Sequence, residues 1–266
     1  MCNNRTLIQR EKEYAKDLIS GLKLRKEGDL VYLTLENAAK IEARIHLNPR
    51  YEKTVDDSNE KSAKHFIKQM KDAAPSDYNE GSIGMIIKRI NSENSTRMSI
   101  DEMGEIARRI IKHASTKDIL MNILKEKNYS LIDEIAKPIN TKIKDSDKER
   151  NRSNFSFATK FCHYMCFYLF EGEECQDNFS IYDNIVIDVL PDYAKFFETK
   201  CDLKSFNKSK KSPSEYYKEY QNCIGDILKK SGNAISRNAF DHIMWYYTKT
   251  RKNVESTKSN SNQLDE

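Results

Sequence analysis

The sequence predicts an all-α fold. Only eight glycines and five prolines occur in 266 residues, whereas all-β folds and Gly-rich nucleotide-binding folds need more turn residues. Aromatic residues make up 10% of the chain, which is enough for a packed core in an otherwise polar sequence. We expect a helical domain over residues 99–250, preceded by a mostly helical region of unknown role over 1–98 and followed by a disordered tail over 251–266.

The N-terminal half contains several segments with helical character. Ser99 and Glu102 form a capping-box pattern, in which each side chain bonds to the backbone amide of the other residue. Ile106 and Ile110 follow at helical spacing, whereas the stretch "APSDYNEGS" interrupts helix formation. Residues 29–47 begin like a strand and end like a helix, and both interpretations stay open. The helices expected here cover residues 6–27, 62–73, 100–114, 116–127 and 130–143.

The C-terminal half begins after a charged connector, residues 142–153. Ser212, Pro213 and Glu215 combine a cap residue, a proline at the first helical position and a capping-box glutamate, which together predict a helix start. No internal repeat is visible. Helices are expected over about 154–170, 183–198, 213–230 and 237–249.

The lack of a membrane-spanning stretch and of a signal core predicts a cytoplasmic protein. The net charge of +4 allows a nucleic-acid partner without demanding one. No stretch reaches the roughly 18 apolar residues of a membrane span, and the N-terminus lacks an apolar signal core, so no membrane partner is expected. The six cysteines should then be reduced thiols. The spacing of Cys162, Cys166 and Cys175 matches no zinc or iron–sulfur pattern, and we expect neither a metal nor another cofactor.

One lysine and one aspartate stand out in the most apolar stretch, residues 154–190. This stretch holds six Phe and three Tyr, and its one lysine is Lys160. A lysine buried in the first turns of a helix tends to lose its proton, because burial and the helix dipole both disfavour the ammonium form. The resulting neutral amine is a nucleophile. Asp183 should cap the next helix and stay ionised, and such a pair could attack the anomeric carbon of a sugar. The structural alternative is that Lys160 extends to solvent and Asp183 is only a cap.

The segment "ATKFCHYMCFYLF…FSIYDNIVIDVL" resembles the catalytic segment of the helix-hairpin-helix DNA glycosylases, most closely the 8-oxoguanine DNA glycosylase branch. In that family a Thr-Lys opens a hydrophobic helix, with a Cys two residues on, and an apolar-x-Asp sequence enters the next helix. Thr159, Lys160, Cys162, Ile181 and Asp183 match this order. The resemblance implies a helix-hairpin-helix glycosylase-like domain. In it, Lys160 would attack C1′ of a modified nucleoside and form a Schiff base, and Asp183 would assist departure of the base. An AP lyase step would follow, as in DNA repair. The composition and the unfamiliar N-terminal region, rather than the resemblance, suggest bacterial phage defence as the other setting.

This hypothesis makes DNA the partner, with the target base flipped out of the stack. Phe157, Tyr182 and Trp245 are candidates for stacking on that base, although aromatic residues in such apolar segments are more often part of the core. The positively charged residues among the candidates for phosphate contact could instead be solvent-exposed charges without a binding role. The candidates for phosphate contact are Ser156, Arg150, Arg152, Lys208, Lys210 and Lys211.

Two other functions stay open. Arg237-Asn238…His242 is similar to the Arg-polar-x3-His pattern of the all-helical HEPN ribonucleases, in which the His would act as base on a ribose 2′-OH while the Arg holds the phosphate. A non-catalytic DNA- or protein-binding module on a degenerate glycosylase fold is the second. The family's hairpin before the lysine contains glycines, and Ser156 and Ala158 occupy those positions here.

Overall fold

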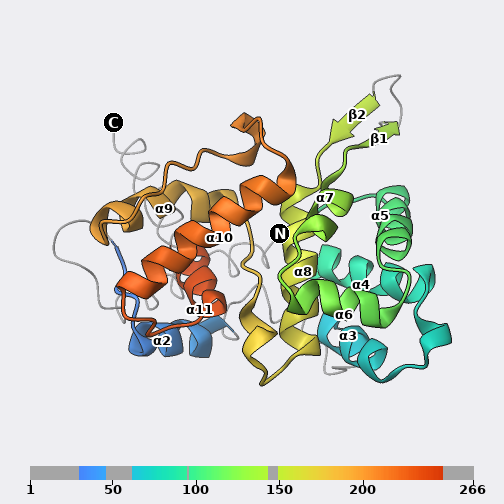
Figure 1. The fold of residues 1–266 in the computed structure, drawn as a ribbon, viewed down its shortest axis with the longest axis horizontal. Helices are drawn as coiled ribbons and strands as arrows, with labels where there is room; N and C mark the ends of the chain where they lie inside the picture. Colours follow the sequence, from blue (N-terminus) through green and yellow to red (C-terminus); the bar gives the residue numbers. More distant parts are fainter. Residues whose placement is uncertain (1–29, 46–61, 95, 143–148, 248–266) are drawn as a thin grey trace, which may run out of the picture. The chain divides into compact units, whose positions relative to one another are not determined.

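The computed structural model describes residues 30–45, 62–94, 96–142 and 149–247, which form an all-α fold with one short β-hairpin (Figure 1). The helix expected over 6–27 and the tail over 251–266 lie outside the described residues. The α-helices are α2 (Leu35–Ile45), α3 (Ala63–Asp72), α4 (Glu80–Glu93), α5 (Ile100–His113), α6 (Lys117–Lys125), α7 (Ser130–Ala136), α8 (Phe155–Leu169), α9 (Asn184–Phe196), α10 (Pro213–Lys230) and α11 (Arg237–His242). The shorter elements are β1 (Ile139–Lys142), β2 (Glu149–Arg152), the 3-10 turns η2 (Pro75–Asp77), η3 (Glu174–Asp177) and η4 (Phe206–Lys208), and the π-turn η5 (Ile243–Tyr247).

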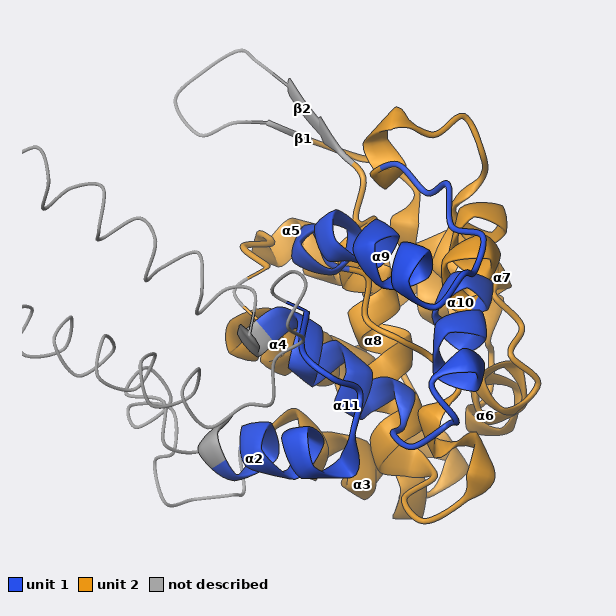
Figure 2. Ribbon diagram, turned by 90° about the vertical axis from the view of Figure 1, so that its left-hand side faces the viewer, with its two compact units in different colours: residues 1–57, 183–204, 222–266 blue, residues 58–182, 205–221 orange. Residues whose placement is uncertain are grey.

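The chain folds into two compact units, which Figure 2 shows in separate colours. Unit 1 comprises residues 1–57, 183–204 and 222–266, and unit 2 comprises residues 58–182 and 205–221. Helices α3 and α4 precede residue 98 but belong to the same unit as α5 to α8. The two units therefore divide the chain at other positions than the sequence-based boundary at residue 98.

Helix α8 is the central helix of unit 2. It packs against α3, α4, α6 and α7, and Phe161, Met165 and Leu169 on it are fully buried. This helix lies in the most apolar stretch of the sequence, and buried residues occur along its whole length. An apolar helix surrounded by others removes apolar surface from water on nearly all of its sides.

Helix starts in unit 2 follow capping chemistry. The predicted box at α5 is confirmed, because Ser99 and Glu102 bond to each other's backbone amides. Ser212 and Glu215 do the same at α10, as expected. Helix α4 was not predicted. It starts from a capping box between Asn79 and Ser82, inside a stretch whose proline and glycine had suggested only a helix break.

The charged connector predicted for 142–153 is instead part of an antiparallel β-hairpin. Strands β1 and β2 pair in the register Ile139 to Arg152 and Lys142 to Glu149. The helix expected over 130–143 ends at Ala136, because Pro138 follows and the residue before a proline disfavours helical geometry. After α7 the backbone is no longer helical, and strand β1 begins two residues after Lys137. The hairpin extends away from α7 in Figure 1.

Unit 1 is built around α2, α9, α11 and η5, which pack on one another in the pairs α2–α11, α2–η5 and α9–η5. The Tyr193 hydroxyl accepts from the Val31 amide at 3.0 Å and donates to the Val31 carbonyl at 2.8 Å. Of the segment 29–47, the described residues 30–45 have an extended start at Val31 followed by helix α2. The strand-like start and the helical end that the sequence suggested are therefore both present.

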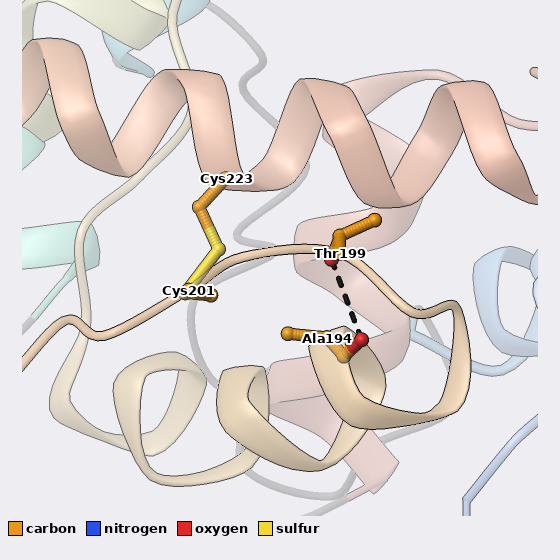
Figure 3. The surroundings of a disulfide bond; sticks show 4 residues. All are labelled: Ala194, Thr199, Cys201 and Cys223. Carbon is orange, nitrogen blue, oxygen red and sulfur yellow. Dashed lines mark hydrogen bonds between the residues drawn. A yellow bond between two sulfur atoms is a disulfide. The ribbon is translucent and has the colours of Figure 1, made fainter.

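A disulfide joins Cys201 and Cys223 in unit 1, with 5.6 Å between their Cα atoms (Figure 3). The expectation of six reduced thiols is therefore wrong for this pair. Cys201 lies in the segment after α9, which is held near the helix end by the Thr199 amide bonding to the Ala194 carbonyl at 2.9 Å. Cys223 lies on α10, and the Cα separation falls in the range that a disulfide can bridge.

Candidate active site at the start of helix α8

The first turns of α8 are bonded to the chain segment that leads into α9. The Thr159 hydroxyl oxygen accepts from the Tyr182 amide at 3.0 Å, and the Ser156 hydroxyl donates to the Tyr182 carbonyl at 3.1 Å. Thr159 is fully buried and also donates to the Ser156 carbonyl at 2.9 Å. Both polar groups of the Tyr182 backbone are thus satisfied by side chains one helical turn apart on α8.

Each candidate catalytic residue directly follows, in sequence, one of the two residues that this hydrogen bond joins. Lys160 directly follows Thr159 on α8 and is half-buried rather than fully buried, so the expected deep burial of its amine is not what the fold provides. Asp183 directly follows Tyr182 and caps α9, since its carboxylate accepts from the Ile185 amide at 2.8 Å. The predicted cap is therefore confirmed. Lys160 belongs to unit 2 and Asp183 is the first residue of the middle segment of unit 1.

An aromatic cluster surrounds the start of α8. The Phe155 ring stacks on Phe206, with ring centroids 4.1 Å apart, and meets Tyr182 edge-on at 4.8 Å. The Tyr182 hydroxyl accepts from the Phe206 amide at 2.9 Å. Tyr220 donates its hydroxyl to the Ile181 carbonyl at 2.7 Å. This cluster fixes residues 181 and 182, and the ring of Tyr182 is part of the core.

The base-stacking candidates occupy different environments. Phe157 and Tyr182 are 3% and 5% exposed, so either ring would have to be uncovered before it could stack on an extruded base. Trp245 lies in the π-turn η5 and is half-buried. Their stacking role stays a prediction.

The phosphate-contact candidates fall into two groups within unit 2. Arg150 and Arg152 are in strand β2. Lys208, Lys210 and Lys211 are exposed in the loop before α10, and Lys211 pairs with Glu219. Ser156 uses its hydroxyl proton for the Tyr182 carbonyl, as described above, and keeps its oxygen lone pairs as acceptors.

A residue that the sequence did not single out lies just before α8. Asn154 is 3% exposed, and neither its amide nitrogen nor its amide oxygen has a hydrogen-bond partner in the described part of the chain. An unpaired buried amide is uncommon in folded proteins. The only sequence signal for Asn154 was an asparagine bordering an apolar helix.

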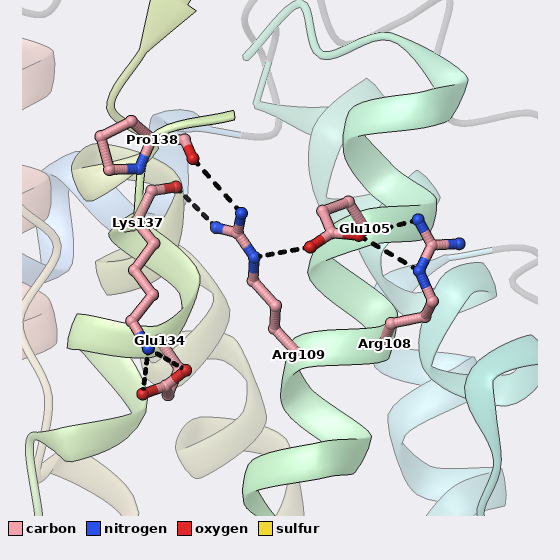
Figure 4. A network of polar contacts seen from close by, with 6 residues as sticks. All are labelled: Glu105, Arg108, Arg109, Glu134, Lys137 and Pro138. Carbon is pink, nitrogen blue, oxygen red and sulfur yellow. Dashed lines mark hydrogen bonds and ion pairs between the residues drawn. The ribbon is translucent and has the colours of Figure 1, made fainter. Parts of the chain in front are cut away.

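A polar network holds the base of the hairpin (Figure 4). The Arg109 guanidinium donates to the carbonyls of Lys137 and Pro138 at 2.6 and 3.3 Å and to Glu105 at 2.9 Å. Arg108 donates to the other Glu105 oxygen. The Glu105 carboxyl has its pKa lowered mainly by its hydrogen bond with Arg108 and further by Arg109.

Three further cysteines are free thiols: Cys162, Cys166 and Cys175. Burial raises the pKa of Cys166 to about 12 and that of Cys162 well above its usual range. Within the described ranges no group of three or more His, Cys, Asp or Glu residues could hold a metal ion. The described helices also include none that is long and apolar enough to cross a membrane.

The Arg237 and His242 pair of the ribonuclease hypothesis lies at the two ends of α11. The His242 Nδ1 atom is 2.8 Å from a Glu42 carboxylate oxygen. Arg237 packs over Gly225 so closely that a Cβ added there would lie 2.9 Å from its guanidinium. Both side chains therefore make contacts that join α11 to α2 and α10 of unit 1.

Comparison with known proteins gives one partial match. Residues 45–167 match the model of the HI_0787_N family, described as an N-terminal domain. The match covers less than half of the chain, includes Lys160 and ends before Asp183. No curated protein and no solved structure matches the chain.

Proposed function

We propose that this protein is a DNA glycosylase with AP lyase activity that uses Lys160 as nucleophile and Asp183 as the assisting carboxylate. The observation that carries the proposal is the pair of hydrogen bonds that join the Tyr182 backbone to the side chains of Ser156 and Thr159. It ties the residue before Asp183 to the helical turn that carries Lys160.

The chemistry requires an unprotonated amine. The Lys160 nitrogen forms a bond to C1′ of a flipped deoxynucleotide as the bond from C1′ to the base breaks, and the base leaves with the bonding electrons and takes up a proton. Asp183 stabilises the positive charge that develops on the sugar. Ring opening and loss of the amine protons give an imine, and removal of a C2′ proton then expels the 3′-phosphate and nicks the strand. Lys160 is half-buried, and the proposed reaction requires that its amine be reached by the substrate.

Borohydride trapping tests the proposal, because it reduces the imine to a stable protein–DNA adduct. Full-length protein is incubated with duplexes and single strands that carry a panel of modified bases. We expect an adduct with wild-type protein and none with Lys160→Gln, which keeps a polar side chain of similar length. The matched control is Lys112→Gln, an exposed lysine on α5, which should trap as wild type does.

The carboxylate is tested by two replacements that both retain a cap. Asp183→Asn and Asp183→Ser can still accept from the Ile185 amide but carry no charge, so both should slow base release at least a hundredfold while α9 stays intact. Absence of trapping across the whole panel, or trapping by Lys160→Gln at the wild-type level, would refute the mechanism. RNA cleavage that is lost in His242→Ala and kept in Lys160→Gln would favour the ribonuclease instead.

A further inference from the structure

Residues 202–212 form a segment whose two ends are both joined covalently to helix α10. At one end, Cys201 is bonded to Cys223 on α10 (Figure 3). At the other end, the segment runs directly into Pro213, the first residue of the helix. None of the residues 201–212 is buried. A segment with so little buried surface belongs to the parts of a protein that open locally at a low cost in free energy.

This segment covers the start of α8 through Phe206. The Phe206 ring stacks on Phe155, the first residue of α8, and the Phe206 amide donates to the Tyr182 hydroxyl. These three residues belong to unit 2, whereas the two bonded cysteines belong to unit 1. Four residues, 202–205, separate the disulfide from Phe206. The disulfide therefore acts on the position of Phe206 through the covalent chain.

The two sulfur atoms of the disulfide differ in their access to solvent. Cys223 is 4% exposed in the interior of α10, whereas Cys201 is half-buried in a segment without helical structure. Because thiol–disulfide exchange depends on access to the attacked sulfur, a reductant can reach Cys201 while α10 stays folded. Upstream of Cys201, the Thr199 amide bonds to the Ala194 carbonyl at 2.9 Å. Opening the disulfide therefore leaves this hydrogen bond, in place of a covalent bond, to hold the upstream end of the segment.

We propose that the disulfide between Cys201 and Cys223 is a redox-sensitive cross-link that holds Phe206 over the start of α8 and that a dithiol reductant opens. One thiolate of the reductant attacks Cys201 Sγ, the S–S bond breaks, and Cys223 leaves as a thiolate that takes up a proton. The second thiol of the reductant then displaces Cys201, which is also protonated, and the reductant becomes a disulfide. Two electrons thus pass to the protein, and a small disulfide reverses the reaction by the same exchange. The inference does not depend on whether Lys160 reacts with DNA.

Reduction of the native protein is the first test. Full-length protein is incubated with dithiothreitol without denaturant and quenched in acid, and its thiols are then labelled after denaturation and located by mass spectrometry. We expect Cys201 and Cys223 to become thiols together while the circular dichroism spectrum stays unchanged. A disulfide that dithiothreitol reduces only in the presence of urea would overturn the proposal, because the bond would then be closed to reductants in the folded state.

Hydrogen exchange tests the effect on Phe206. In the reduced protein the Phe206 amide should exchange about fivefold faster, the ratio expected when one ordinary hydrogen bond is lost. The Tyr182 and Ser214 amides should keep their rates, because Thr159 and the Asp133 carboxylate accept from them.

Two variants complete the hydrogen-exchange experiment. Cys201→Ser without reductant should match reduced wild type, and Cys175→Ser, which removes a free thiol, should match oxidised wild type. A Phe206 amide that exchanges equally in the oxidised and reduced proteins would overturn the proposal. Equal acceleration at Phe206, Tyr182 and Ser214 would overturn it as well, because reduction would then weaken the fold as a whole.

Discussion

The Thr159 hydroxyl oxygen accepts a hydrogen bond from the backbone amide of Tyr182 at 3.0 Å, although the two residues are 23 positions apart in sequence. Thr159 is fully buried, so no water can replace it as the acceptor. The residue that precedes the candidate catalytic lysine therefore fixes the residue that precedes the candidate carboxylate. The hydrogen bond alone explains why a residue with a hydroxyl group occupies position 159, whether or not the site is catalytic.

Replacing Thr159 with valine should lower the free energy of unfolding by about 1–3 kcal/mol, because the buried Tyr182 amide loses its partner. Valine keeps the branched shape, so helix packing changes little. Urea denaturation measures the loss. Hydrogen exchange identifies its cause, since the Tyr182 amide should exchange faster in Thr159→Val and remain protected in Thr159→Ser. Equal protection of this amide in wild type and Thr159→Val would show that the hydrogen bond contributes nothing.

Replacing Arg109 with alanine should loosen the base of the hairpin. The guanidinium donates to the carbonyls of Lys137 and Pro138 and to Glu105, and hydrogen bonds from a charged donor contribute about 1.5–3 kcal/mol each. We expect a loss of about 2 kcal/mol in the free energy of unfolding, with faster hydrogen exchange in β1 and β2. Arg108→Ala is the control, because its side chain is 57% exposed. It should unfold at nearly the same urea concentration as wild type. A hairpin that exchanges equally in both variants would contradict this role of Arg109.

Glu105 gives a pH dependence of known sign. Its pKa is lowered from the ordinary value of 4.5, first by Arg108 and then by Arg109. The contribution of the ionised Glu105 carboxylate to the free energy of unfolding is therefore complete at pH values above 4.5. It is lost as the pH falls through the lowered pKa of the folded state. Because the side chain is 34% exposed, Glu105→Gln should destabilise the protein by about 0.2–1 kcal/mol at pH 7. The difference from wild type should shrink below pH 4.5 in urea denaturation, and a difference that grows on acidification would contradict the assignment.

The free cysteines should differ in reactivity. Because burial raises the pKa values of Cys162 and Cys166, both remain neutral thiols at pH 8, and only a thiolate reacts readily with iodoacetamide. Cys175 is half-buried and its pKa is also raised, by burial and by Glu173, but reagent can reach it. Mass spectrometry of the native protein at pH 8 should find Cys175 labelled first. Labelling of Cys162 or Cys166 at the rate seen in urea would show that they are not buried.

The elements that the sequence predicted well have local signals. The start of α5 follows from Ser99 and Glu102, and the burial of α8 follows from its apolar composition, so neighbouring residues alone determine both. The starts of α4 and of the hairpin were missed for the opposite reason. Asn79 caps a helix that contains two glycines, and Pro138 ends α7 in a segment whose charges resemble an exposed linker.

Features of the candidate site that depend on distant residues could not be predicted. The order Thr159, Lys160 and Asp183 was visible in the sequence, but the bonds from Ser156 and Thr159 to Tyr182 depend on how the segment after α8 returns to its start. Partial exposure of Lys160 depends in the same way on which helices surround α8. Composition showed that the helix is buried, and it could not show which of its side chains lies at the edge of the core.

The disulfide between Cys201 and Cys223 is a further feature of this kind, because it requires a particular face of α10 to meet the segment after α9. A cross-link stabilises mainly by restricting the unfolded chain, and the two cysteines are 22 residues apart, which corresponds to about 3 kcal/mol. Cys223→Ser should therefore lower the free energy of unfolding by about 3 kcal/mol without reductant. Reductant should remove the difference between this variant and wild type, and Cys175→Ser should unfold as wild type does under both conditions. Denatured wild-type protein should also expose two fewer titratable thiols before reduction than after it. Equal thiol counts before and after reduction would show that the disulfide does not form. If the disulfide forms but Cys223→Ser and wild type have the same free energy of unfolding, the disulfide destabilises the native state by as much as it destabilises the unfolded chain.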